Sequence, residues 1–299
     1  MFDQSPPPEH QADEPTRVLQ RPQEAPERTR HAEAPAAWVG VATEIGRRHR
    51  TNQDAYSAGV SGDWAALVVC DGVSSSIGAE RASQVAATTV RNALLDAVGP
   101  DADRDWDATF GSAYQAAQRA VLALGEDGSP VGSCTLVAAL VHGHEIHLGN
   151  IGDTRAYWVP DAPTPGAPAP ATVQLSVDDS LAQAQIELGY SREQAESSRQ
   201  AHAITRWIGP DAPELNPRMR HFRAEAPGIL VVCSDGLWNY ASAPEAMGDL
   251  VGRTLAEVGG GRVAAGASTD LRDVARTLTE WACQQGGRDN ITVALAHVD

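Results

Sequence analysis

Residues 64–72 read WAALVVCDG, and residues 228–236 read GILVVCSDG. In each stretch, an apolar run of strand length ends at an aspartate followed by glycine, Asp71-Gly72 and Asp235-Gly236. Each run is typical of a buried strand that carries a carboxylate out of the core where the strand stops. Because an isolated Asp-Gly pair is far more often a turn than a ligand, neither stretch alone predicts a site.

Outside these two runs, the apolar residues follow two periods. Strand-like runs occupy 133–143, 145–159 and 290–298, and apolar residues at three- and four-residue steps predict helices over 82–94, 110–124, 244–258 and 269–284. The strands come in adjacent groups and do not alternate strictly with helices, so we expect an α+β fold of antiparallel sheets covered by helices. Both periods recur from residue 38 to residue 299, which predicts a single domain over that span.

Two further acids also lie near the boundaries of predicted segments. They are Asp54 in RHRTNQDA and Asp289, which immediately precedes the final strand-like run. If the four strand ends converge, Asp54, Asp71, Asp235 and Asp289 form a cluster that cannot stay ionised near neutral pH without cations, because like charges raise each other's pKa. Oxygen ligands select hard ions such as Mg²⁺ or Mn²⁺. The sequence therefore predicts a metal centre, on the condition that these strand ends meet.

The charge composition removes several classes of function. The chain has 39 acidic and 23 basic residues, a formal net charge of -16, which argues against a nucleic-acid partner. All of the basic residues are arginine. Without lysine, the chain has no Walker-type phosphate loop, no kinase-type strand lysine and no Schiff-base lysine.

Segments outside the periodic regions predict a tail and a loop. Residues 1–37 contain seven prolines and almost no large apolar side chain, so we expect a disordered tail rich in proline and acidic residues. A second proline-rich stretch, 160–171, predicts a surface loop insertion.

Cysteine placement and hydropathy predict the compartment. The four cysteines lie apart, mostly within apolar runs, and are predicted to be buried thiols rather than a disulfide framework. The first residues carry no secretory pattern. Apolar runs of about seven residues fall far short of the ~20 that a membrane helix needs. We therefore expect a cytoplasmic protein with no membrane partner.

Eight blocks occur in a fixed order along the chain and together indicate a family. They are RHRTNQDAYS, VVCDGVSSSIGAERAS, VGSCTLVAAL, LGNIGDTRAYW, LSVDDSLAQAQIELG, HAITRWIG, VVCSDGLWN and GGRDNITV. In this order, from residue 38 to 299, the chain resembles the metal-dependent protein serine/threonine phosphatases of the protein phosphatase 2C-like (PPM) family, and in particular their bacterial members. The resemblance implies a four-layer α-β-β-α sandwich of two antiparallel sheets flanked by helices, with two divalent ions, Mn²⁺ or Mg²⁺, in a cleft at one end.

The resemblance also implies a role for each acid. Asp71 would bridge both ions, the carbonyl of Gly72 would bind one of them, and Asp235 and Asp289 would hold the other. Asp54, preceded by Gln53 where the family often has glutamate, would act through bound waters. Asn290 would orient Asp289.

The implied reaction is hydrolysis of phosphoserine and phosphothreonine in proteins by a hydroxide held between the two metal ions. Its partners would be a phosphorylated protein substrate and a cognate serine/threonine kinase whose action it opposes; the substrate could also be one specific regulatory protein. The alternative is a catalytically weak or silent phosphatase-like module that binds a phosphoprotein. Intact acids favour activity, because a silent module has no physical reason to keep mutually repelling carboxylates.

Three positions depart from the family pattern. Where relatives commonly have a phosphate-binding arginine, this chain has His49 between Arg48 and Arg50, so each of these three residues is a candidate for phosphate binding. Val73 stands where animal relatives have a histidine. Asp127 matches an acid that bacterial relatives use for a third ion, but its usual aspartate partner is replaced by Asn239, so we expect a weak third ion at most.

Other polar residues are predicted to serve the architecture. Asp153, in the hairpin-like NIGDTR, is expected to be structural. Asp178 and Asp179 precede a helical run and are expected to cap it. The segment 181–201 corresponds to a mobile flap beside the cleft in relatives and is expected to set substrate choice.

Overall fold

The computed structural model describes residues 30–99, 104–161, 170–198, 200–259 and 269–299. Its elements follow one another as β1 Arg30–Ala36, β2 Val39–Glu44, β3 Ala55–Ser61, β4 Trp64–Cys70, α1 Ala79–Ala97, α2 Trp106–Ala123, β5 Leu136–His142, β6 Glu145–Ile151, β7 Arg155–Pro160, β8 Val173–Gln174, α3 Leu181–Glu187, α4 Arg192–Glu196, β9 Arg218–Arg223, β10 Gly228–Cys233, α5 Asp235–Trp238, α6 Pro244–Val258, α7 Leu271–Gln285 and β11 Ile291–Val298.

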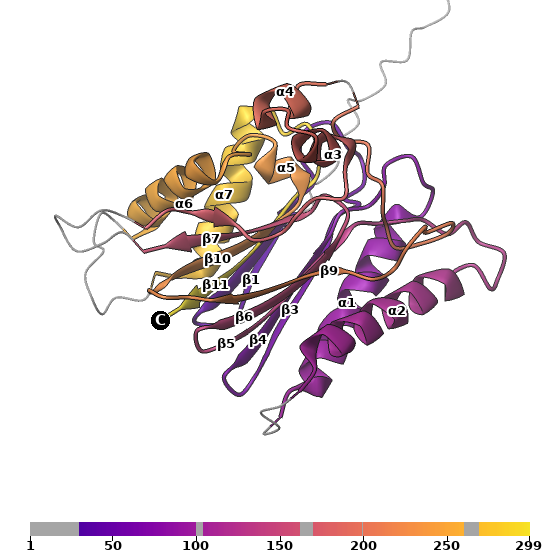
Figure 1. The fold of residues 1–299 in the computed structure, drawn as a ribbon, viewed down its shortest axis with the longest axis horizontal. Coiled ribbons are helices and arrows are strands. Elements are labelled where there is room, and N and C mark those ends of the chain that lie inside the picture. The colour runs from indigo at the N-terminus through magenta and orange to yellow at the C-terminus, as the bar shows by residue number, and fades with distance from the viewer. Residues whose placement is uncertain (1–29, 100–103, 162–169, 199, 260–268) are drawn as a thin grey trace, which may run out of the picture.

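Two antiparallel sheets lie face to face between two pairs of helices (Figure 1). One sheet has the strand order β1-β2-β11-β10-β7-β8, and the other has the order β3-β4-β5-β6-β9. Helices α6 and α7 cover the outer face of the first sheet, and α1 and α2 cover that of the second. The prediction of an α+β sandwich with four layers is confirmed.

Burial on both faces explains why the central strands are continuous apolar runs. In β4, Leu67 and Val69 face the other sheet, whereas Val68 and Cys70 face α1 and α2. Side chains alternate across a strand, so a strand covered on both sides needs apolar residues at every position. The strand β10 is buried along its whole length in the same way. Because the middle of each central strand is buried between layers, the polar residues at the strand ends are the ones that a ligand can reach.

The first strand corrects part of the predicted tail. Residues 30–36, assigned from composition to the tail, form β1 and pair with β2. Arg30 also forms an ion pair with the buried Glu44 of β2. Pro35, one of the prolines of the predicted tail, lies on an edge strand, where a missing N–H is tolerated. The rest of the predicted tail, and the centre of the predicted loop at 160–171, lie outside the described residues.

The cysteines and the helices agree with the predicted interior. All of the cysteines are buried and none forms a disulfide, as predicted. In the described part of the chain, no helix has the length and hydropathy to span a bilayer.

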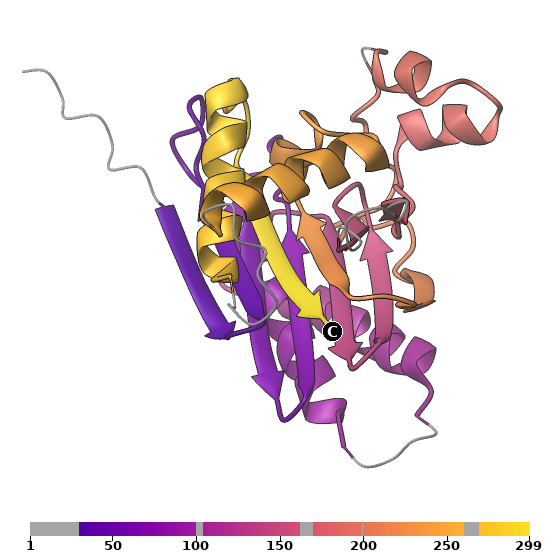
Figure 2. The same cartoon turned by 90° about the vertical axis from the view of Figure 1, so that its left-hand side faces the viewer.

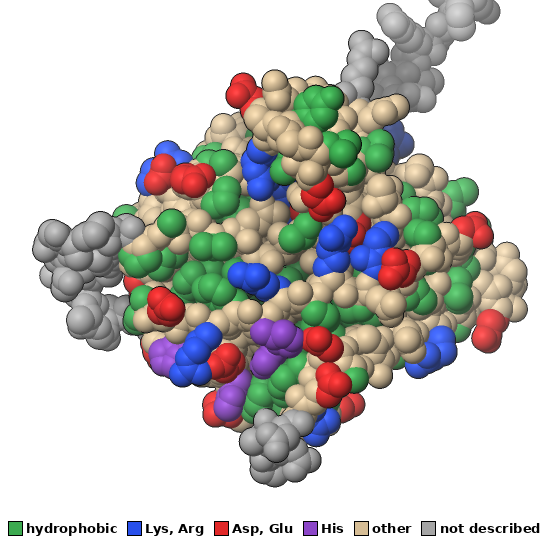
Figure 3. All heavy atoms as spheres, viewed as in Figure 1, with side chains coloured by type: hydrophobic (Ala, Val, Ile, Leu, Met, Phe, Trp, Pro, Cys, Tyr) green, Lys and Arg blue, Asp and Glu red, His purple; other side chains and the backbone are tan. Residues whose placement is uncertain are grey.

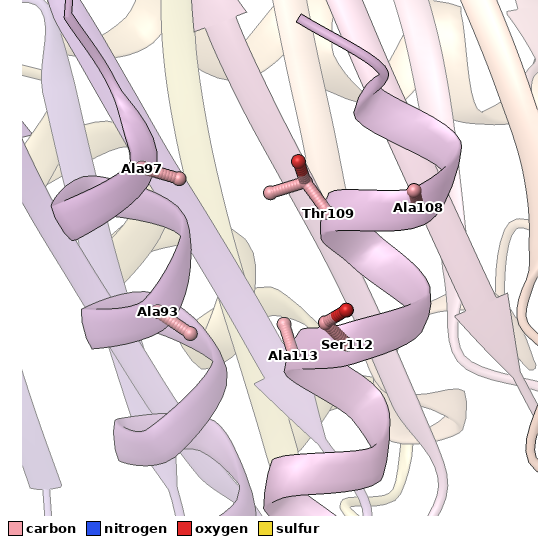
Figure 4. A pocket seen from close by; sticks show the side chains of 6 residues that line it. All are labelled: Ala93, Ala97, Ala108, Thr109, Ser112 and Ala113. Carbon is pink, nitrogen blue, oxygen red and sulfur yellow. The ribbon is translucent and has the colours of Figure 1, made fainter.

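Between α1 and α2 lies an open depression of ≈ 350 Å³ lined by alanine, serine and threonine (Figure 4). Its lining carries no charged group, so we assign it no role in binding.

The segment 181–201 is called the flap below, and its helices, like many charged side chains, lie at the surface. The helices α3 and α4 stand beyond one end of the sheets in both ribbon views, on the side where α5 begins (Figures 1 and 2). Acidic and basic side chains are interspersed on the face in Figure 3, and histidines gather near its lower edge. The side chains of His147 and His221 are directly paired across β6 and β9.

Candidate metal centre

The four predicted acids come from two strand ends in each sheet. Asp54 immediately precedes β3 and Asp71 follows β4, and these strands pair so that Ala55 lies opposite Cys70. Asp235 follows β10 and Asp289 precedes β11, which are neighbours in the other sheet. Since the two sheets are stacked, the four carboxylates meet at one end of the sandwich.

Burial and mutual repulsion raise the pKa values of these acids. Burial, followed by repulsion from Asp54, Asp235, Asp153 and Asp289, raises the pKa of Asp71 well above its usual value. Burial and then repulsion by Asp289 raise the pKa of Asp235 to about 7, although a hydrogen bond with Asp71 acts in the opposite direction. These carboxylates resist ionisation when no cation is bound, and bound cations would stabilise their ionised form.

The pKa of Asp54 is raised in the same way, and a hydrogen bond also holds its side chain. Burial is the main cause that raises the pKa of Asp54 to about 7, and Asp235 and Asp289 add repulsion. The hydroxyl of Ser234 donates a hydrogen bond of 2.7 Å to Asp54 Oδ2. This bond joins the end of β10 in one sheet to the approach to β3 in the other.

Asp235 offers an oxygen with no protein partner. Its Oδ2 accepts a hydrogen bond of 3.1 Å from Asn239 Nδ2, whereas its buried Oδ1 has no hydrogen-bond partner among the described residues. A buried oxygen without a partner is costly unless a cation or water satisfies it. The donor set here, carboxylate oxygens with raised pKa values and a free lone pair, therefore fits hard divalent ions.

Close backbone approach explains the glycines of both Asp-Gly pairs. A Cβ on Gly72 would lie 2.6 Å from the carbonyl oxygen of Gln53, and one on Gly236 would lie 1.9 Å from that of Asn290. These glycines allow the loops before β3 and β11 to pass directly beside the strand ends. The Asp-Gly pattern thus reflects contact between distant segments and not only a local turn.

Asn290 supports the site differently from the expected way. Its backbone N–H donates to Asp289 Oδ1 at 2.9 Å, while its side-chain Oδ1 accepts from the N–H of Gln53 at 2.7 Å and its Nδ2 donates to Ile45 O at 2.8 Å. The side chain therefore holds the loop that carries Asp54, and the backbone orients Asp289.

Among the three candidates for phosphate binding, His49 is engaged by an acid of the cluster. His49 Nε2 lies 3.1 Å from Asp289 Oδ1, whereas Arg48 and Arg50 are exposed. The structure thus places His49 beside a predicted metal ligand.

The structure adds a residue to the site and revises the role of Asp153. Ligand atoms of Asp153, His202 and Asp235 all lie within 4.8 Å of one another, close enough to share one ion. The carbonyl of Asp153 accepts a hydrogen bond from Trp238 Nε1, which is the structural role expected, but its buried side chain faces Asp235. His202 was not predicted, because a single histidine in HAITRWIG has no ligand spacing to distinguish it.

Asp127 lies elsewhere in the described structure. It is exposed, in the loop after α2, and its Oδ1 accepts a hydrogen bond of 2.9 Å from the N–H of Ser129. It is not part of the ligand group that contains Asp153 and Asp235.

Buried arginine contacts attach the flap to the sandwich. Arg155 is 2 % exposed, and its guanidinium donates to Asp178 at 2.8 Å and to Glu196 of α4 at 2.9 Å. Its Cζ lies 3.6 Å from the centroid of the Trp238 ring. Asp178 is therefore an ion-pair partner and not the predicted helix cap.

Asp179 does not cap the helix either, because Ser180 takes that position. Asp179 accepts bonds from Arg218 at 2.7 Å and from Arg206 at 3.3 Å. Ser180 caps α3 instead, with its side chain accepting from the N–H of Gln183. The prediction of acidic caps was wrong because arginines distant in the sequence compete for these carboxylates.

A pocket of ≈ 290 Å³ opens beside the cluster. Its walls include Glu196 and His202 from the flap side, Trp238 and Tyr240 from α5 and the turn after it, and Arg288 and Asp289 before β11. The pocket therefore connects the acid cluster with the flap.

Comparison with known proteins agrees with this arrangement. A family model described as protein phosphatase 2C matches residues 44–275. The protein phosphatase PhpP of Streptococcus pneumoniae is 26% identical over 267 residues, which cover 87% of this chain and 97% of PhpP. The serine/threonine protein phosphatase PstP of Mycobacterium tuberculosis is 28% identical over 251 residues, 83% of this chain and 42% of PstP.

Solved structures share the fold. The crystal structure of the M. tuberculosis phosphatase PstP/Ppp superposes with a TM-score of 0.67 at 26% identity, covering 87% of this chain and 98% of that one. A structure of the PstP catalytic domain in complex with two manganese ions gives a TM-score of 0.64 at 24% identity, covering 91% and 100%. Since the family model spans most of the chain and the predicted acids meet at one end of the matching fold, this chain belongs to the protein phosphatase 2C family.

Proposed function

We propose that this chain removes phosphate from phosphoserine and phosphothreonine side chains of proteins with the aid of two divalent cations, Mn²⁺ or Mg²⁺. The observation that carries the proposal is the convergence of Asp54, Asp71, Asp235 and Asp289, with the pKa of Asp54 and of Asp235 raised to about 7. Family membership supplies the reaction class.

The residues divide into ligands and supports. Asp71 is central, because each of the other acids repels it, so its carboxylate would contact both ions, and the carbonyl of Gly72 would bind one of them. Asp235 and Asp289 would hold the other ion, and Asp54 would act through bound water. When bound, such cations lower the pKa of water toward neutrality and neutralise charge on the phosphoryl oxygens.

The chain's own groups hold this arrangement in place. Ser234 fixes Asp54, Asn239 fixes one oxygen of Asp235, and the backbone N–H of Asn290 fixes one oxygen of Asp289. These bonds leave the second oxygen of Asp235 free. Ligands oriented before an ion binds lose less conformational entropy on binding.

A third ion, if it binds, has better placed donors at Asp153, His202 and Asp235 than at Asp127. The imidazole would favour Mn²⁺ over Mg²⁺ at that position, because nitrogen ligands suit transition metals.

The physiological partners we propose are a phosphorylated protein in the cytoplasm and the serine/threonine kinase that modifies it. We also propose that residues 30–299 form one domain.

The test is hydrolysis of a phosphothreonine peptide with Mn²⁺, with chelator, and in the variants Asp71→Asn and Asp235→Asn. We expect metal-dependent turnover that chelator abolishes and that either variant lowers by orders of magnitude. Asp249→Asn, which changes an exposed acid of α6, is the matched control and should retain turnover. Turnover without metal, or full activity in both site variants, would refute the assignment; binding of phosphopeptide with no turnover under any metal would favour the silent module.

A further inference from the structure

The pocket beside the acid cluster has a cation on its wall that no acid of the described residues neutralises. Arg288 is exposed there, and its guanidinium makes no hydrogen bond or ion pair with any residue that the structure describes. Its backbone N–H, in contrast, is bonded. The guanidinium is therefore available to a bound molecule.

The two acids of the pocket already have partners within the chain. Glu196 accepts from Arg155 at 2.9 Å, from Arg192 at 3.0 Å and from the hydroxyl of Ser242 at 2.5 Å. Asp289 has His49 at 3.1 Å and belongs to the predicted metal ligands. Both acids of the pocket therefore have partners within the chain, and the guanidinium of Arg288 is left to pair with an anion.

A glycine turn and a hydrogen bond to Tyr240 position the backbone of Arg288. Gly286 and Gly287 both have positive φ, 148° and 53°, at the end of α7. The N–H of Arg288 donates to Tyr240 Oη at 3.2 Å, and the Tyr240 ring packs edge-on against Trp281 at 6.3 Å. The backbone of Arg288 is thus positioned from two sides, which leaves the guanidinium as the adjustable part.

The pocket also has the position of a subsite for a residue next to the phosphorylated one. It begins at Asp289 in the acid cluster and extends to Glu196 on the flap, with Trp238 and Tyr240 as apolar walls. An extended peptide advances about 3.3–3.6 Å per residue, so a chain with its phosphate at the cluster reaches this volume with an adjacent side chain.

We propose that Arg288 is a specificity-determining residue that binds an anionic side chain adjacent to the phosphorylated residue of the protein substrate. The chemistry recognised is an oxyanion, either the carboxylate of an acidic residue or a second phosphate. Arginine pairs with both through two parallel hydrogen bonds. The inference rests on the proposed phosphatase function and adds the sequence context that the site selects.

The experiment compares kcat/KM on matched phosphothreonine peptides that carry glutamate, glutamine, arginine or a second phosphoserine within two residues of the target. Wild-type protein should prefer the glutamate and phosphoserine peptides to the glutamine peptide by about tenfold, the equivalent of about 1.4 kcal/mol. In Arg288→Gln that ratio should fall to about one, and in Arg288→Glu the arginine peptide should become the better substrate. Arg253→Gln, which changes an exposed arginine of α6, is the control and should keep the wild-type ratio.

A second readout separates this inference from the proposed function. Fluorescence anisotropy of the same labelled peptides in chelator measures binding without turnover, so the glutamate preference and its loss in Arg288→Gln are testable even in a protein that hydrolyses nothing. Failure of every phosphopeptide to be hydrolysed would defeat the proposed function alone. An unchanged ratio in Arg288→Gln overturns the subsite. Equal losses on all peptides and on p-nitrophenyl phosphate, which has no neighbouring residue, also overturn it, because Arg288 would then contact the reacting phosphoryl group.

Discussion

Ser234 and Asp54, 180 positions apart in the chain, are joined by a hydrogen bond of 2.7 Å from Ser234 Oγ to Asp54 Oδ2. The same hydroxyl oxygen accepts a bond of 2.9 Å from the N–H of Thr292. One small side chain thus connects β10, β11 and the segment leading into β3, and links both sheets at the acid cluster.

Replacing Ser234 with alanine should therefore weaken both the fold and the metal centre. Losing the donor leaves Asp54 Oδ2 and the Thr292 N–H without this partner, and we expect a cost of about 1–3 kcal/mol in the free energy of unfolding. The affinity for Mn²⁺ should fall as well, since Asp54 loses its orientation. Urea unfolding and calorimetric Mn²⁺ titration measure the two effects. Ser112→Ala, on the exposed face of α2, is the control; equal Mn²⁺ affinities in Ser234→Ala and wild type would contradict the positioning role.

The pH dependence of stability should follow from the raised pKa of Asp54 and Asp235, about 7 in the fold against an ordinary value of 3.8. Between about pH 4 and pH 7 the folded state holds more protons than the unfolded state. The stability of the metal-free protein should therefore fall as pH rises through that window, by about 1.4 kcal/mol per pH unit for an isolated group of this kind. Thermal melts in chelator from about pH 4.5 to about pH 8 span that window and measure the fall. Added Mn²⁺ should stabilise most at the upper end, where the acids are ionised.

Asp54→Asn provides the matched comparison for that pH profile. The amide has no charge to repel Asp235 or Asp289, so the metal-free variant should lose less stability over the same pH range. A profile identical to that of the wild type would show that Asp54 is not among the groups responsible.

Removal of the Arg155 guanidinium should release the flap. Arg155→Gln leaves Asp178 buried without its partner and breaks the bond to Glu196, which we expect to cost about 3–5 kcal/mol of unfolding free energy. The flap should also become more susceptible to proteolysis than the sheets. Arg223→Gln, in an exposed ion pair with Glu145, should change stability little. Unaltered cleavage of segment 181–201 in Arg155→Gln would rule out the anchoring role.

Any third manganese ion should depend on His202 more than on Asp127. His202→Ala removes one of three ligand atoms that lie within 4.8 Å of one another, whereas Asp127 is exposed in a loop and bonds to Ser129. Counting bound Mn²⁺ by electron paramagnetic resonance at increasing concentration should show loss of the weakest site in His202→Ala. Loss in Asp127→Asn and retention in His202→Ala would instead place the third ion at Asp127.

The aspartates that follow β4 and β10 could be located from the sequence because they obey a local rule. The run WAALVVC must be a buried strand, and the aspartate that follows it must leave the core. The same reasoning located Asp235, and the order of the eight blocks indicated the family. Local sequence was a poor guide where partners are distant: Asp178 and Asp179 resemble helix caps but pair with arginines, and residues 30–36 resemble a tail but form β1.

The linear sequence was sufficient to predict the α+β class, the strands that end in aspartate and the reaction class, because apolar period and motif order are properties of the chain itself. Folding in three dimensions was needed to bring Asp153 and His202 beside Asp235, to pair His49 with Asp289, and to set Arg288 at the wall of a pocket. Those relationships depend on how the two sheets stack and on where the flap packs against them. Contacts between residues far apart in the chain arise from packing of the whole domain, which no local pattern encodes.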